Sequence, residues 1–128
     1  MTDMFYISTE IVFSAGHFIA LPNGGFEAPH KHDWKVRVTI GREYLDQQDM
    51  VMDFHQLEKI LRQAIYPCTQ VEDINQLPAF QNRNPSTELF AHYIYHSVKA
   101  LLPRDVLLTE VVVWETPTCR SIYRPESL

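Results

Sequence analysis

Two short stretches decide the fold: residues 13–17 read Phe-Ser-Ala-Gly-His, and residues 29–34 read Pro-His-Lys-His-Asp-Trp. His30 and His32 are two positions apart, so in a β-strand both side chains leave the same face. That face continues with apolar side chains as far as Ile40, whereas the residues between them are polar or charged. Upstream, the residues that share the parity of His17 are mostly apolar from Phe5 onward. The alternation predicts two half-buried strands, each with histidine at one end.

The segment between the two stretches predicts a hairpin. It contains Pro22, Asn23, Gly24 and Gly25, which favour a loop. An antiparallel hairpin closed by this loop would place the end of the first strand beside the start of the second. The three histidines of the two stretches would then converge on one point.

Three imidazoles without a fourth protein ligand are typical of a zinc site that keeps one position open to water or substrate. We therefore predict a metal site at His17, His30 and His32, with Zn²⁺ as the first choice. Imidazole also suits iron, nickel and copper, so the spacing does not fix the metal. The alternative is that these are ordinary hydrogen-bonded strand histidines.

The middle of the chain predicts two helices. Apolar residues recur at helical spacing from Phe54 to Tyr66, after an Asp53 that can cap the helix and before a Pro67 that would end it. The irregular residues 68–83 are expected to form a loop. A second helix is expected to begin at Asn84-Pro85, with asparagine as the cap and proline in the first position.

Two further strands are predicted over residues 106–115 and 119–123. The order strand, strand, helix, helix, strand, strand favours an α+β domain spanning residues 1–128, in which a four-stranded antiparallel sheet carries both helices on one face.

The composition limits the kinds of partner that the protein is expected to bind. A hydrophobic content of 45% with 21% charged residues is typical of a globular domain, and a net charge of −5 argues against nucleic acid as the main partner. We see neither a signal-peptide pattern nor an apolar run that could span a membrane. Cys68 and Cys119 are not in a Cys-x-x-Cys motif, so we read them as reduced thiols. We expect a cytoplasmic protein that binds neither nucleic acid nor membrane.

Three more segments matter when taken together with the histidine stretches: Val51-Met52-Asp53-Phe54, Asn84-Pro85-Ser86-Thr87-Glu88 and Trp114-Glu115-Thr116. The set resembles the 6-pyruvoyltetrahydropterin and 6-carboxytetrahydropterin synthase family, of the T-fold class. The resemblance implies a pterin substrate, zinc held by the three histidines, and a homo-oligomer in which trimers close a barrel and two trimers stack into a hexamer. It also implies that Glu115 holds the pterin ring, with Thr87 and Glu88 among the substrate-binding residues.

The chain departs from the family in its acid–base residues. The family's catalytic cysteine falls at Phe26, whereas Glu27 precedes His30 by three residues. Glu-x-x-His-x-His is similar to a variant branch in which glutamate replaces the cysteine and 6-hydroxymethyl-dihydropterin is formed, so Glu27 is the predicted base. Gln70-Val71 stand where the family has Asp-His. The family's Gly, Asn and Tyr around the second zinc histidine are replaced by Lys31, Asp33 and Trp34.

The leading functional hypothesis is a zinc-dependent pterin lyase acting on dihydroneopterin triphosphate or a related dihydropterin. The product and the pathway, whether folate, biopterin or 7-deazaguanine, remain open. One alternative is a catalytically silent, metal-containing pterin or purine binder. A cupin-like metalloprotein would also use His-x-His on strands, but the two helices argue against it. A metallo-β-lactamase-type hydrolase would need Asp-His where Trp34 and Lys35 stand. We expect His55, His92 and His96 to be surface residues.

The second face of the predicted sheet is too apolar to remain in water. Val12, Leu108, Val112 and Trp114 share the parity opposite to the helix-covered side. Such a face, together with two open sheet edges, predicts that several copies close into a barrel. The resemblance implies in addition that Glu115 lies near a zinc site on a neighbouring chain, so that the pterin pocket is built between chains.

Overall fold

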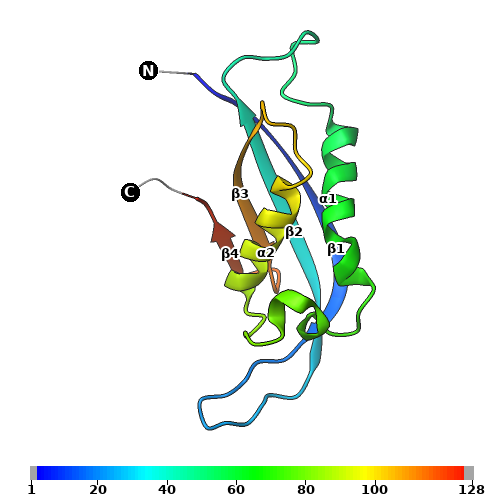
Figure 1. The fold of residues 1–128 in the computed structure, drawn as a ribbon, viewed down its shortest axis with the longest axis vertical. Helices are drawn as coiled ribbons and strands as arrows, with labels where there is room; N and C mark the ends of the chain where they lie inside the picture. Colours follow the sequence, from blue (N-terminus) through cyan, green and yellow to red (C-terminus); the bar gives the residue numbers. More distant parts are fainter. Residues whose placement is uncertain (1–2, 126–128) are drawn as a thin grey trace.

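The computed structural model describes residues 3–125 as one antiparallel sheet with two helices packed on one of its faces (Figure 1). The strands lie in the order β1-β2-β3-β4. The elements are β1 (Phe5–His17), β2 (His30–Arg42), α1 (Phe54–Thr69), α2 (Thr87–Lys99), β3 (Leu107–Trp114) and β4 (Arg120–Tyr123), with short 3-10 helices at Ile74–Gln76 and Pro78–Phe80. The predicted α+β class, the four-stranded antiparallel sheet and the placement of both helices on one face are confirmed. Among the described residues, no helix is both long enough and apolar enough to cross a membrane.

The β1–β2 hairpin has the register that the alternating pattern predicts. His17 pairs with His30, and Ala15 pairs with His32, so the histidine-bearing ends of the two strands lie side by side. The apolar residues of β2 between Trp34 and Ile40 are fully buried.

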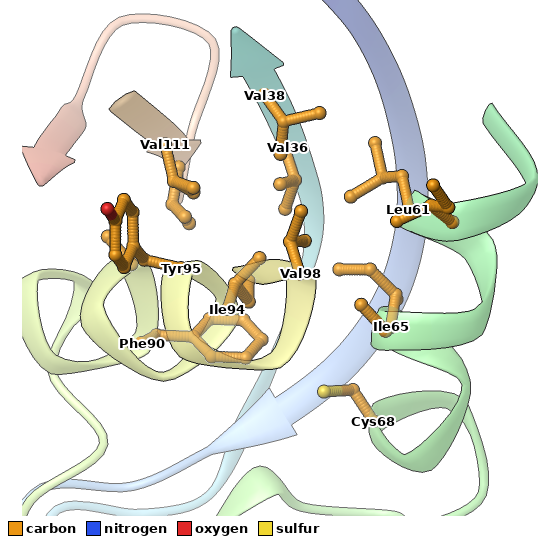
Figure 2. Close-up of a cluster of buried hydrophobic side chains, with 14 of the residues drawn as sticks. Val36, Val38, Leu61, Ile65, Cys68, Phe90, Ile94, Tyr95, Val98 and Val111 are labelled. Carbon is orange, nitrogen blue, oxygen red and sulfur yellow. The ribbon is translucent and has the colours of Figure 1, made fainter. Parts of the chain in front are cut away.

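The core fills the space between the sheet and the helices. Figure 2 shows the side chains of both helices directed toward the sheet. The fully buried side chains of this layer include Val36, Val38, Leu57, Leu61, Phe90, Ile94, Val98 and Val111. This packing fixes the sheet against α2. The segment that precedes α2 contacts the histidines, because the Pro85 carbonyl oxygen lies 3.0 Å from His17 Nδ1.

Both predicted helix boundaries between residues 66 and 87 were wrong. Helix α1 continues through Pro67 to Thr69, because a proline in the last turn removes few hydrogen bonds and the fully buried Cys68 holds this turn against the core. Helix α2 begins at Thr87, and its cap is Ser86, whose Oγ accepts a hydrogen bond from the Leu89 amide at 3.2 Å. Asn84 does not cap the helix, because its side chain is hydrogen-bonded to Ala20 instead.

A β-bulge in β3 changes which side chains face the helices. Glu110 pairs with Thr39 and Leu108 pairs with Ile40, so Thr109 is an extra residue on β3. Leu108 is consequently turned into the core and is only 3% exposed. Its predicted place on the second face was therefore wrong. Val112 and Trp114 do lie on that face, opposite Arg37 and Lys35.

Candidate metal centre

The three imidazoles converge where β1 ends and β2 begins. One ring nitrogen from each of His17, His30 and His32 lies within 4.8 Å of the others. The ring centroids of His17 and His30 are 4.6 Å apart, and those of His30 and His32 are 4.7 Å apart. The hairpin therefore brings together the residues that the spacing singled out. We call them the three-histidine cluster.

Hydrogen bonds to backbone carbonyls orient two of these rings. The Nδ1 atom of His17 lies 3.0 Å from the Pro85 carbonyl oxygen, and the Nδ1 atom of His30 lies 3.1 Å from that of Ala28. A carbonyl oxygen only accepts, so each Nδ1 carries a proton and each Nε2 presents a lone pair. This is the arrangement in which metal-binding imidazoles are held by protein partners.

Two ring nitrogens of the cluster lack a hydrogen-bond partner within the described part of the chain. The Nε2 atoms of His17 and His32 are buried and lack a hydrogen-bond partner among the described residues. Burial is the main cause that lowers the pKa of His32 below 6.5; the neighbouring His17 and His30 add to the shift, and Glu115 opposes it. His32 is therefore neutral at pH 7 and can donate electrons to a cation.

Glu115 lies beside the cluster, just after the end of β3. Its Oε1 atom lies 3.1 Å from His17 Nε2 and 3.8 Å from His32 Nε2. A proton or a metal ion on His17 Nε2 would make this contact attractive. The three imidazoles are a donor set that suits Zn²⁺ and other first-row metal ions. The residues present therefore fit a metal, and the orphaned Nε2 atoms are what a metal would satisfy.

Glu115 lies beside the histidines of its own chain, and the placement of pterin pockets between chains stays a prediction about the oligomer. The pairing of Trp114 with Lys35 brings the next residue of β3 to the histidine end of β2. Glu115 thus reaches the cluster of its own chain.

Glu27 lies beside the cluster in the hairpin loop. Its Oε1 atom is 3.9 Å from His30 Nδ1 and accepts a hydrogen bond from the Ile19 amide at 3.0 Å. The Glu27 amide in turn donates to the Ile19 carbonyl at 3.0 Å. The carboxylate is therefore held near His30 while remaining about one third exposed, at 34%.

Trp34 forms the floor of the cluster. Its ring is fully buried, meets His17 and His32 edge to face, and donates from Nε1 to the Ala15 carbonyl at 3.0 Å. Beside it, Gly16 allows a close approach of the chain at residues 72–73: its amide donates to the Glu72 carbonyl at 2.9 Å, and a Cβ atom here would overlap Asp73 Oδ1. The site thus has a rigid base.

Two asparagines fix the chain that leaves His17, and sequence reasoning missed this role. Asn75 accepts from the Phe18 amide at 3.0 Å and donates to the Phe18 carbonyl at 2.9 Å. Asn84 accepts from the Ala20 amide at 2.8 Å. The only signal in the sequence was the place of these asparagines in Ile74-Asn75 and Asn84-Pro85, and the second was interpreted as a helix cap.

Other predicted residues lie apart from the imidazoles. Thr87 opens α2, and Glu88 accepts a hydrogen bond from Ser121 on β4 at 3.3 Å. Within residues 3–125 neither side chain is hydrogen-bonded to the cluster. Gln70, in the position of the family's acidic residue, is exposed and donates to Thr69. His55, His92 and His96 are exposed, as expected.

A cavity of about 420 Å³ opens next to the cluster on the second face of the sheet. His32 and Glu115 line it together with Lys31, Lys35 and Trp114. The cavity thus combines a possible metal ligand, two carboxylates (Glu115 and Asp33) and two lysine cations. A carboxylate can accept planar N–H donors, and a lysine can pair with an anionic group.

Comparison with known proteins agrees with this geometry. A model of the family described as 6-pyruvoyl tetrahydropterin synthase matches residues 6–126. The 6-carboxy-5,6,7,8-tetrahydropterin synthase of Bacillus subtilis is 30% identical over 129 residues, covering 95% of this chain and 86% of the relative. The human 6-pyruvoyl tetrahydrobiopterin synthase is 32% identical over 106 residues, covering 82% of this chain and 69% of the relative.

Solved structures share the fold. The 6-pyruvoyl tetrahydropterin synthase of Caenorhabditis elegans superposes with a TM-score of 0.79 at 17% identity, covering 98% of both chains. That of Plasmodium vivax superposes with a TM-score of 0.73 at 19% identity, covering 98% of this chain and 99% of the other. With the sheet, the cluster and the matched residues in agreement, the chain belongs to the 6-pyruvoyl tetrahydropterin synthase family.

Proposed function

We propose that this protein is a zinc-dependent lyase that processes the side chain of a dihydropterin, with dihydroneopterin triphosphate as the first candidate substrate. The observation that carries the proposal is the contact of Glu115 with the three-histidine cluster at the mouth of the cavity. It supports the proposal because a carboxylate suited to ring binding lies beside imidazoles suited to metal binding. Relatives of this chain are named as tetrahydropterin synthases.

The cavity residues suit such a substrate. A carboxylate can accept two coplanar N–H bonds from the 2-amino and N3 edge of a pterin. To bind both, Glu115 would turn Oε1 away from His17 when the ring enters. Lys31 and Lys35 line the same cavity and provide charge for an anionic substituent such as a triphosphate.

A zinc ion in the cluster would polarise the side-chain hydroxyl of the substrate and favour its ionisation. The chain itself must accept the proton, and Glu27 is the base that we propose. The Ile19 amide holds its carboxylate near His30, and part of it is open to solvent. Proton transfer needs approach to hydrogen-bonding distance, which the substrate side chain would reach on binding next to His30.

Glutamate as the base has support among the structural relatives. Two structures of the Plasmodium vivax enzyme carry alanine or cysteine in place of a glutamate described as a catalytic residue. Glu27 stands next to Phe26, the position of the family's cysteine, and so we assign this chain to the glutamate-bearing type. From this assignment we infer that the product is 6-hydroxymethyl-dihydropterin.

A second candidate function is a pterin-binding protein without turnover. It is favoured by Gln70-Val71, which offer no acid–base group where the family has Asp-His, and by the exposure of Gln70. This protein would bind the ring through Glu115 and leave the substrate unchanged.

One experiment separates the two functions. The metal-loaded protein is incubated with dihydroneopterin triphosphate and with dihydroneopterin, and products are identified by mass while binding is followed by pterin fluorescence. We expect turnover, and about a 100-fold or greater loss of it in Glu27→Gln with binding retained. Binding without turnover in the wild type would support the silent binder, and absence of both would overturn the pterin assignment.

A further inference from the structure

The exposed face of α2 carries a second group of imidazoles, far along the chain from the three-histidine cluster. His92 and His96 are one helical turn apart, and their Nε2 atoms are 3.1 Å apart. The rings lie at 71° with centroids 4.5 Å apart. Both residues are exposed, so solvent ions can reach them. We call these two residues the His92–His96 pair.

The separation of the two nitrogens fits cis coordination of one metal ion. Two nitrogens that are each about 2.1 Å from a metal lie about 3.0 Å apart at a right angle and about 3.4 Å apart at a tetrahedral angle. The observed 3.1 Å falls between these values. The pair therefore already has the bite of a two-nitrogen chelate.

Neighbouring aromatic rings hold the imidazoles in this position. Tyr123 of β4 meets His92 edge to face at 4.9 Å between centroids and lies 6.2 Å from His96. Tyr95 packs against His96 at 5.4 Å. Side chains that are fixed before binding lose less conformational entropy when they bind. The contacts favour chelation over two freely rotating surface histidines.

The space beside the pair and the protonation state of His96 suit a metal with water ligands, although Lys99 and Arg83 also lie nearby. Burial lowers the pKa of His96, and the neighbouring His92 and Lys99 lower it further, which favours the neutral imidazole that a metal can bind. A cavity of about 440 Å³ borders both histidines and leaves room for further ligands.

We propose that His92 and His96 form a second, exchangeable site for a transition-metal ion that prefers imidazole, such as Ni²⁺, Cu²⁺ or Zn²⁺. The pair supplies two nitrogen ligands, and water fills the remaining positions. With fewer protein ligands, the site is weaker than the three-histidine cluster. The inference does not rest on the proposed enzymatic function.

Ni²⁺ binding in a variant without the first site tests the proposal. The background His30→Ala/His32→Ala removes the three-histidine cluster, and equilibrium dialysis against Ni²⁺ then reports the remaining sites. We expect one Ni²⁺ per chain. Adding His92→Ala or His96→Ala should weaken binding about tenfold or more, because the second nitrogen of a chelate binds intramolecularly. The matched control is His55→Ala, which removes an exposed histidine from the other helix and should leave binding unchanged.

A second arm covers the case in which the background variant does not fold. The wild type and His92→Ala/His96→Ala are first saturated with Zn²⁺ at the tight site, and the additional Ni²⁺ that each binds is measured. We expect the wild type to bind one more ion per chain than the double variant. Equal Ni²⁺ binding with and without the pair, in either arm, would show that the 3.1 Å contact is only an N–H···N hydrogen bond and would overturn the proposal.

Discussion

His17 Nε2 and Glu115 Oε1 face each other at 3.1 Å, although both atoms are acceptors when His17 donates from Nδ1 to the Pro85 carbonyl. A buried acceptor without a donor destabilises a protein by about 1–3 kcal/mol. A cation between the two atoms changes this repulsion into attraction. The relationship between these two residues is therefore the strongest structural reason to expect a metal.

Metal analysis tests this expectation directly. We expect the purified wild type to hold one tightly bound divalent metal per chain, and His30→Ala and His32→Ala to lose most of it. Because burial lowers the pKa of His32, protons compete with the metal for this imidazole at a lower pH than for an ordinary histidine. Metal content should therefore be stable at pH 7 and decrease in acid. Full metal content in both variants would show that the cluster is not the ligand set.

The role of Glu115 can be examined by an isosteric change. Glu115→Gln keeps the shape but removes the negative charge, and one N–H acceptor becomes a donor. We expect pterin affinity, measured by fluorescence titration, to decrease about tenfold or more, because charge-assisted hydrogen bonds contribute about 1.5–3 kcal/mol. The exposed Glu43→Gln carries the same chemical change away from the site and is the control. Equal affinities in the two variants would assign the ring to another residue.

Gly16→Ala should destabilise the fold. The added methyl group would overlap Asp73 Oδ1 and approach the Glu72 carbonyl oxygen within 3.0 Å. We expect a loss of about 1–3 kcal/mol in the free energy of unfolding, seen as a melting temperature lowered by several degrees. Gly25→Ala, in the hairpin loop, meets only Asn23 Oδ1 at 3.3 Å and should unfold nearly as the wild type does. Equal melting temperatures for the two variants would mean that residues 72–73 can move to accommodate the added methyl group without loss of stability.

The two cysteines should differ in reactivity. Burial raises the pKa of the Cys68 thiol to about 12, so at pH 8 it stays protonated and unreactive, while Cys119 is exposed. A maleimide reagent should label one thiol per native chain and two after denaturation. Cys119→Ser should then show no labelling in the native state. Rapid labelling of that variant would reveal frequent opening of the last turn of α1.

Oligomerisation remains a prediction that the second sheet face supports. Val12 is 65% exposed and Ile122 is 47% exposed, and they lie on strands at the two edges of the sheet. We expect sedimentation to show a trimer or a hexamer at micromolar concentration, because joining edges would cover both groups. A stable monomer with full activity would refute this.

Mixing two inactive variants tests where the site lies within such an oligomer. Glu115 and His32 approach each other within one chain, at 3.8 Å. If each site uses Glu115 and His32 of the same chain, mixtures of Glu115→Ala and His32→Ala chains remain inactive. Activity regained by mixing would instead show that the ring-binding glutamate comes from a neighbouring subunit.

The periodic parts of the fold and the three-histidine cluster could be predicted from the sequence because they depend on local alternation. The pattern of β1 and β2 fixes which side chains share a face, and one loop then fixes the register. Pro67 was misjudged because burial of Cys68 outweighs the local preference of proline to end a helix. Leu108 was assigned to the wrong face because a bulge reverses the alternation of the residues that precede it in the strand. The composition of the strand does not indicate where a bulge occurs.

Contacts between distant segments were harder to predict. The pairing of Asn84 with Ala20 depends on the whole fold, whereas the local sequence favours a helix cap equally well. The approach of Glu115 to the histidines of its own chain depends on the register of β3 against β2. The composition of the two strands does not determine that register. The His92–His96 pair was recognised as exposed, but its nitrogen separation depends on rotamers that Tyr123 selects.

The reach of His17 to Pro85, 68 positions along the chain, also determines when the site can form during synthesis. The hairpin with all three histidines leaves the ribosome early, because chains emerge from the N-terminus. The carbonyl that orients His17 and the carboxylate that faces it emerge much later. A nascent chain can therefore present three imidazoles to passing ions long before it has the groups that set their geometry. Accurate metal selection belongs to the finished chain, so metal loading is expected to be among the last events of its maturation.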